Sequence, residues 1–198
     1  VSHGAMAGYQ ADLLDVSQDV DDYAVGLAET IVEAAGSAGS EGDFQQLIRS
    51  ETEDVLDSFG IGFDYVDQQL GDVSTSDVEK VLRYQGITFD DVPFRREDVR
   101  DVTVQPDAVA GACVIDHKSP GVLDSSRERE KVLGQLASYM VVVAQVQNVD
   151  VTDTVGVALD GEDYLFIHGD DLSQVERRPV NEGSTEEFVS LLVGHWAV

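Results

Sequence analysis

The chain of 198 residues contains a single cysteine, only three lysines, and no long apolar run. The lone Cys113 excludes an intrachain disulfide framework and a cysteine-rich zinc or iron–sulfur site. No stretch approaches the roughly 20 consecutive apolar residues of a membrane-spanning helix, and the first residues lack the basic start and apolar middle of a secretory signal. Walker motifs, glycine-rich dinucleotide loops and zinc-finger spacings are also missing. These absences favour a cytoplasmic protein.

Basic residues are scarce beside acidic ones: 12 Lys and Arg stand against 39 Asp and Glu, for a net charge of −27. The acids are dispersed along the chain and do not form the like-charged blocks of disordered tails. An apolar fraction of 42% is enough for a packed core. Screening over about 3 Å at 1 M salt makes such self-repulsion tolerable. The composition therefore predicts a halophilic, haloarchaeal protein, and in molar salt acidity is weak evidence against a nucleic-acid partner.

Apolar residues at helical spacing, together with capping residues, predict five helices. They cover residues 9–35, 41–59, 76–85, 124–147 and 184–196. Ser40 is the expected cap of the second helix, and Gly60 its expected end. A capping box from Ser184 to Glu187 is expected to open the last helix.

Runs of β-branched and small residues predict two hairpins. In the first, the runs DVTVQPDAVAG and ACVIDHK meet at Gly111. In the second, TVGVALDGEDYLFIHG turns at Asp160-Gly161, a dipeptide typical of tight hairpins. The predicted order along the chain is therefore three helices, two strands, one helix, two strands and one helix. This order predicts an α/β domain with a central mixed sheet flanked by helices.

The predicted α/β domain covers residues 41–198. A helical extension over residues 9–40 precedes it. Residues 1–8, VSHGAMAG, are expected to be the remnant of an expression tag.

The stretch PDAVAGACVIDHK, which begins at Pro106, combines a buried strand with charged residues at its end. With a period of two, Asp116 and Lys118 share one face of the strand, whereas His117 points to the other. The hairpin brings Asp107 back alongside them. Two carboxylates beside one ammonium can hold Mg²⁺, which prefers oxygen ligands. The lysine can then orient or deprotonate a water, or neutralise charge on a phosphate.

This stretch resembles the PD-(D/E)xK nuclease signature, and it is similar to the N-terminal nuclease domains of restriction–modification enzymes, including the type I motor subunit and type IIG-like enzymes. The resemblance implies a restriction-endonuclease-like core and a DNA endonuclease that uses Mg²⁺, with Mn²⁺ as a substitute. It also implies DNA as the partner, with methylase, helicase or specificity domains outside this chain. The family has glutamate more often than aspartate at the position of Asp116.

The next predicted helix contains GQLASYM, which places Gln135 and Tyr139 four residues apart on one helix face. This pair is similar to the Q-x-x-x-Y motif of RecB-like members of the superfamily. The resemblance implies that both side chains face the metal site and position the DNA substrate.

The family also places a glutamate from an early helix beside the metal, and two residues fit. Glu41 stands at the start of the second helix, where the family often has it. Glu51 lies on the apolar stripe of that helix, where an inward carboxylate needs a partner. The sequence does not decide between them, although the family position favours Glu41.

A second hypothesis is a non-catalytic module that keeps the nuclease fold for binding DNA or protein. The acidic composition motivates it, as does the shortage of basic clusters. The basic residues that do cluster are Arg95, Arg96, Arg100, Arg127 and Arg129. Uptake of Mn²⁺ would discriminate between the two hypotheses, because a complete metal site is expected only of the nuclease.

Overall fold

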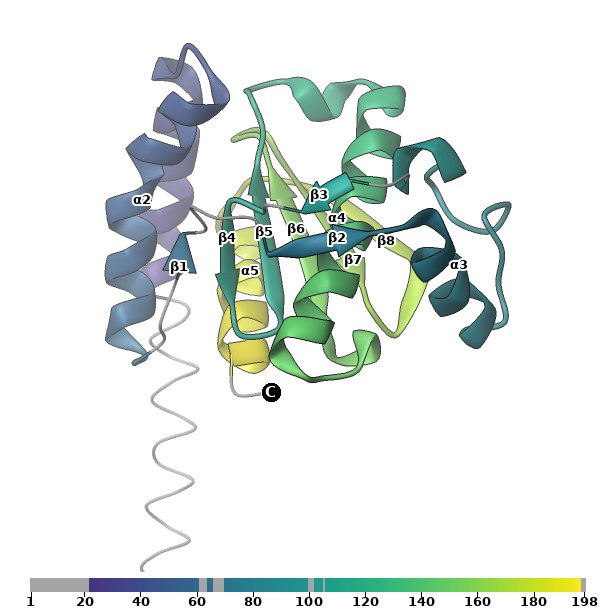
Figure 1. The fold of residues 1–198 in the computed structure, drawn as a ribbon. Coiled ribbons are helices and arrows are strands. Elements are labelled where there is room, and N and C mark those ends of the chain that lie inside the picture. The colour runs from purple at the N-terminus through teal and green to yellow at the C-terminus, as the bar shows by residue number, and fades with distance from the viewer. Residues whose placement is uncertain (1–21, 61–63, 66–69, 100–101, 105, 197–198) are drawn as a thin grey trace, which may run out of the picture.

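The computed structural model describes residues 22–60, 64–65, 70–99, 102–104 and 106–196 (Figure 1). The predicted tag remnant and the first part of the predicted helix over 9–35 lie outside these residues. Of that helix, the described part is helical from residue 22 onward and extends to residue 37. Among the described helices, none combines the length and the apolar character needed to span a bilayer.

Four further α-helices and eight strands follow. The helices are α2 (Glu41–Ser58), α3 (Thr75–Tyr84), α4 (Ser126–Gln147) and α5 (Glu182–Trp196). The strands are β1 (Asp64–Tyr65), β2 (Gly71–Val73), β3 (Val102–Val104), β4 (Ala108–Ala110), β5 (Cys113–His117), β6 (Val155–Leu159), β7 (Asp163–His168) and β8 (Asp171–Pro179). Three short 3₁₀ turns complete the chain: η1 (Arg96–Val99), η2 (Val122–Asp124) and η3 (Val151–Asp153).

Six strands form the central sheet in the order β1-β4-β5-β6-β7-β8, and β2 pairs with β3 in a separate ribbon. Strands β5 and β6 are parallel and are joined through α4, whereas the other neighbours in the large sheet are antiparallel. The structure therefore confirms the predicted α/β fold with a mixed sheet flanked by helices (Figure 1).

The two faces of the sheet bury two separate apolar clusters. Val114 packs in the cluster on the α3 and α4 side. Its strand neighbours Cys113 and Ile115 pack in the other, with apolar residues of α2, α5 and the helix over 22–37. Period-two alternation along β5 thus sends successive side chains to opposite layers, as the sequence predicted. Burial raises the pKa of the Cys113 thiol, which agrees with an inert buried cysteine.

Both predicted hairpins are present, with Gly111 and Gly161 at φ values of 56° and 86° in their turns. The first predicted strand needs a correction. Its residues divide into β3, which pairs with β2, and β4, which joins the main sheet. Strand β8 was also not predicted, and it pairs along β7 at the edge of the sheet.

Helix α2 begins as predicted, because the Ser40 side chain accepts a hydrogen bond from the backbone of Asp43. The predicted start of the last helix is wrong. Helix α5 begins at Glu182, and Asn181 and Ser184 exchange reciprocal backbone-to-side-chain bonds of 2.9 Å. Ser184 therefore lies inside the first turn, and its partner in the box is Asn181 instead of Glu187.

Candidate active site

Asp107 and Asp116 meet at the end of the first hairpin. The register pairs Ala108 with Ile115, so Asp107, one residue earlier, comes beside Asp116, one residue later. One oxygen of each carboxyl group lies within 4.8 Å of an oxygen of the other. The backbone N–H of His117 also donates to Asp107 Oδ2 at 2.6 Å, which fixes that carboxylate against β5. The predicted convergence of Asp107 and Asp116 is therefore present.

Glu41, the first residue of α2, completes a group of three carboxylates. One oxygen from each of Glu41, Asp107 and Asp116 lies within 4.8 Å of the other two. Glu51 lies elsewhere: its Oε1 is 3.7 Å from the position that a Cβ on Gly26 would occupy, on the helix over 22–37. Of the two glutamates that the sequence left open, the structure brings Glu41 to the site.

Burial and mutual repulsion set the charge of the three acids. Asp116 is 3% exposed, and burial together with the charge of Asp107 raises its pKa to about 8 against the opposing pull of Lys118. Partial burial also raises the pKa of Glu41. Burial opposes ionisation of Asp107 as well, but hydrogen bonds from His117 and Asp116 outweigh it and lower the pKa. In the absence of a cation, Asp116 therefore favours its protonated form and Asp107 its carboxylate form.

This donor set fits a hard divalent cation. All three groups offer carboxylate oxygens, the ligands that Mg²⁺ prefers. Asp116 Oδ2 is also a buried oxygen without a hydrogen-bond partner, although Lys118 Nζ lies 2.9 Å from it. A buried polar atom of this kind is costly unless something binds it. A cation that displaced the proton of Asp116 would satisfy this oxygen.

Lys118 lies on the α4 side of the sheet and begins a chain of hydrogen bonds. Its Nζ donates to Gln135 Oε1 at 2.8 Å, and Gln135 Nε2 donates to Tyr139 Oη at 2.6 Å. Both ends of the Gln135 amide are thus engaged within the protein. The structure brings Lys118 together with Gln135 and Tyr139 beside the carboxylates. Gln135 and Tyr139 share one face of α4, as their four-residue spacing predicts.

The His117 side chain approaches Asp107, although it points to the opposite face of β5 from Asp116. Its ring lies on the α2 side, 6.0 Å from the Phe44 ring centroid, as the alternation predicted. However, its buried Nδ1 has no hydrogen-bond partner and lies 3.6 Å from Asp107 Oδ2. Sequence reasoning missed this contact because Asp107 sits at the strand end, where it is reached from both faces.

Asp160 is a second residue whose role the sequence did not reveal. It is fully buried, and its carboxylate accepts backbone hydrogen bonds from Leu123, Glu162 and Asp163 at 2.8–3.0 Å. The first of these bonds ties η2 to the β6–β7 turn. Asp160 thereby fixes the segment that leads from Lys118 into α4.

Comparison with models of known protein families, with curated proteins and with solved structures finds no match to this chain. The likeness to PD-(D/E)xK nucleases therefore rests on the motif residues of the sequence.

The choice between the two glutamates gives a first testable prediction. Glu41→Gln should weaken Mn²⁺ binding by at least about tenfold, because even residues behind a metal's ligands commonly cost that much. Glu51→Gln should leave the affinity unchanged, since its carboxylate lies against the helix at Gly26. Isothermal titration calorimetry in molar KCl measures both. Equal losses in the two variants would contradict the assignment of Glu41.

Proposed function

We propose that this chain is a Mg²⁺-dependent DNA endonuclease domain that hydrolyses phosphodiester bonds in a restriction–modification or other DNA-defence system. The observation that carries the proposal is the meeting of Glu41, Asp107 and Asp116 within 4.8 Å, with Lys118 at 2.9 Å from Asp116. Methylase, helicase or specificity functions would belong to other domains.

Glu41, Asp107 and Asp116 would hold the cation, with Mn²⁺ as a substitute for Mg²⁺. A bound divalent ion would polarise a phosphate oxygen and offset the negative charge that develops during hydrolysis. Asp107 is well placed for this task because the His117 backbone already orients it. Asp116 adds a ligand from the neighbouring strand.

Lys118 acts as a charged donor in this proposal. Burial lowers its pKa, but the carboxylates of Asp116, Glu41 and Asp107 raise it further, and the net direction is upward. The side chain is therefore an ammonium at neutral pH. Of the roles that the sequence left open, this favours stabilising charge on the phosphate and orienting the water over removing a proton from that water.

Gln135 and Tyr139 support Lys118. The Gln135 carbonyl accepts from the ammonium, which holds it beside Asp116. Burial, together with the nearby carboxylates, raises the pKa of Tyr139, so its phenol stays protonated and retains a hydrogen to donate. The inferred role of Gln135 is thus to position Lys118 and Tyr139, and Tyr139 is the better candidate for contact with the DNA.

The proposal predicts that the chain cleaves plasmid DNA in molar KCl when Mg²⁺ or Mn²⁺ is present, and not when EDTA is added. Lys118→Ala should lower the rate roughly 10²–10³-fold, the usual cost of removing one preorganised donor to a developing charge. Lys131→Ala, which removes an exposed lysine paired with Glu128, serves as the control and should keep full activity. Equal rates in the wild type and Lys118→Ala would refute the nuclease assignment.

A further inference from the structure

The few basic residues of this chain are concentrated near one part of the sequence. Nine of the twelve fall between positions 80 and 131: Lys80, Arg83, Arg95, Arg96, Arg100, Lys118, Arg127, Arg129 and Lys131. Three of them, Arg83, Arg95 and Arg96, line one hollow of about 630 Å³ between α3 and the segment over 87–96. We call this feature the arginine hollow.

The arginine hollow is electrically neutral in a strongly acidic protein. Its charged lining consists of the three arginines and of three acids, Glu79, Asp90 and Glu130, whereas the whole chain carries −27. The remaining basic residues, Arg49, Arg177 and Arg178, lie elsewhere, and each is paired with a carboxylate. A polyanion that approaches the protein therefore meets less repulsion at the arginine hollow than the net charge of the chain implies.

Two guanidinium groups of the arginine hollow, those of Arg83 and Arg95, can change partners at little cost, whereas Arg96 donates two hydrogen bonds to Glu79 at 2.9 and 3.1 Å. Among the described residues, no carboxylate lies within ion-pair distance of the exposed Arg83. Arg95 contacts Glu97 and Glu130 at 3.4 and 3.3 Å with more than half of its side chain exposed. Such exposed pairs contribute only about 0–1 kcal/mol. Phosphate, which guanidinium binds through two parallel hydrogen bonds, can replace these contacts.

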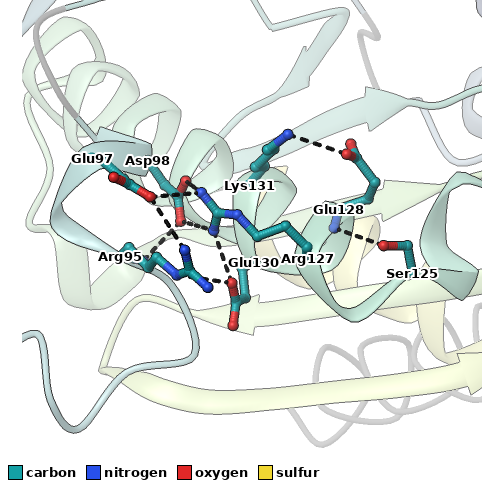
Figure 2. A network of polar contacts seen from close by, with 8 residues as sticks. All are labelled: Arg95, Glu97, Asp98, Ser125, Arg127, Glu128, Glu130 and Lys131. Atoms are coloured by element: carbon teal, nitrogen blue, oxygen red, sulfur yellow. Dashed lines mark hydrogen bonds and ion pairs between the residues drawn. The ribbon is translucent and has the colours of Figure 1, made fainter.

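Helix α4 connects the arginine hollow to the active site. Figure 2 shows Arg127 of α4 reaching Asp98 of η1, with bonds of 3.0 and 2.8 Å to its two oxygens. A Cβ on Gly134 would lie 2.5 Å from the Asp98 Cβ, so only glycine lets η1 pack this closely on the helix. The next residue is Gln135, which holds Lys118.

The arginine hollow and the active site both include residues of α4. Glu130 lines the hollow five residues before Gln135, which is about 8 Å along the axis of α4 at 1.5 Å per residue. Successive phosphates of one strand are spaced about 3.4 Å along the duplex axis. On a strand that follows the axis of α4 from Lys118, phosphates roughly two nucleotides away would come level with Glu130 of the hollow.

We propose that the arginine hollow binds the phosphate backbone of the DNA that the active site cleaves, through Arg83 and Arg95. This inference rests on the proposed function. The contacts hold the strand in position without reading its sequence, since phosphates carry no base information. Arg127 has a different role, because it is occupied in joining η1 to α4.

Binding of a fluorescein-labelled duplex, measured by anisotropy in EDTA, tests the proposal without cleavage. The KCl series starts at the lowest concentration at which circular dichroism shows the protein folded. The double variant Arg83→Ala/Arg95→Ala should bind more weakly, and the slope of log K against log[KCl] should become shallower by about two, or about 0.9 per lost phosphate contact. The double variant Arg49→Ala/Arg177→Ala makes the same change in net charge at other surfaces and should keep the wild-type slope.

The outcomes separate this proposal from the proposed function. The arginine hollow is not the DNA-binding surface if both double variants show the wild-type slope, or if the slope becomes shallower by the same amount in both. This holds whether or not the wild type cleaves plasmid. If the slope falls only in Arg83→Ala/Arg95→Ala while the wild type fails to cleave with any divalent ion, the binding surface stands and the nuclease assignment fails.

Discussion

Asp116→Ala should abolish both Mn²⁺ uptake and plasmid cleavage, the largest effect expected of any single substitution in this chain. Asp116 is the most buried of the three acids, and its Oδ2 is a buried oxygen without a hydrogen-bond partner. Without it, Glu41 and Asp107 remain as two partly exposed acids, and Mg²⁺ bound through so few protein ligands stays largely hydrated. The titration heat with Mn²⁺ and the rate of plasmid cleavage should therefore disappear together.

The fold should survive this substitution. Burial makes the charged form of Asp116 unfavourable, and Lys118 keeps its bond to Gln135 when the carboxylate is gone. Asp116→Asn preserves the size of the side chain and provides a second variant. Asp54→Ala removes an exposed carboxylate from α2 and is the matched control. Circular dichroism in molar KCl should give the same spectrum for all four proteins.

Thermal stability offers an independent measurement of the same prediction. A ligand that binds only the folded state stabilises it by mass action, by about 2.7 kcal/mol at a hundred times its Kd. Mn²⁺ should accordingly raise the Tm of the wild type and of Asp54→Ala, but not that of Asp116→Ala. Metal uptake that persists in Asp116→Ala would contradict the site. Metal uptake by a wild type that cleaves no DNA would instead favour the hypothesis of a non-catalytic module.

The first hairpin shows what local sequence can predict. Gly111 places the turn, and alternation along the strand then determines which side chains share a face. Asp107, Asp116 and Lys118 could be grouped from this information alone. The placement of Gln135 at the site followed from the resemblance to the Q-x-x-x-Y motif, and helical spacing predicted only that it shares a face with Tyr139. These relations depend on residues close in sequence, where backbone geometry leaves few choices.

The third carboxylate could not be predicted in the same way. Glu41 and Glu51 lie on the same helix, and which of them meets Asp107 depends on how α2 packs across the sheet. That packing involves the helix over 22–37, which the Glu51 carboxylate faces near Gly26. The charge state of Lys118 is likewise a tertiary property, because it results from burial and from carboxylates on three separate elements.

Strand β8 was missed for a different reason. It lies at the edge of the sheet, and most of its side chains are exposed or half-buried, so its sequence DLSQVERRP lacks the apolar run of a central strand. Charged side chains are typical of edge strands, where they discourage pairing with other molecules. The cap of α5 was misassigned because the Ser-to-Glu spacing of a capping box does not include Asn181, which caps the helix in the structure.

The melting temperature should rise steeply as KCl increases from dilute buffer to molar concentration. The 12 basic residues cannot offset 39 acids, because the ion pairs in the structure are mostly exposed and such pairs contribute little. The excess charge repels itself in the folded state until salt screens it. If screening restores about 5 kcal/mol of a typical ~5–15 kcal/mol stability, the Tm should rise by roughly 10–20 °C in a domain of this size.

A charge variant separates screening from other effects of the salt. Asp54→Lys/Asp57→Lys alters two exposed positions on α2 and changes the net charge by +4, from −27 to −23. Its Tm should be higher than that of the wild type in dilute buffer, and the difference should shrink in molar KCl. Gln46→Ala, a neutral change on the same exposed face, should follow the wild-type curve. A wild-type Tm that stays flat across the series would remove the halophilic interpretation, and the charge of −27 would then count against DNA as the partner.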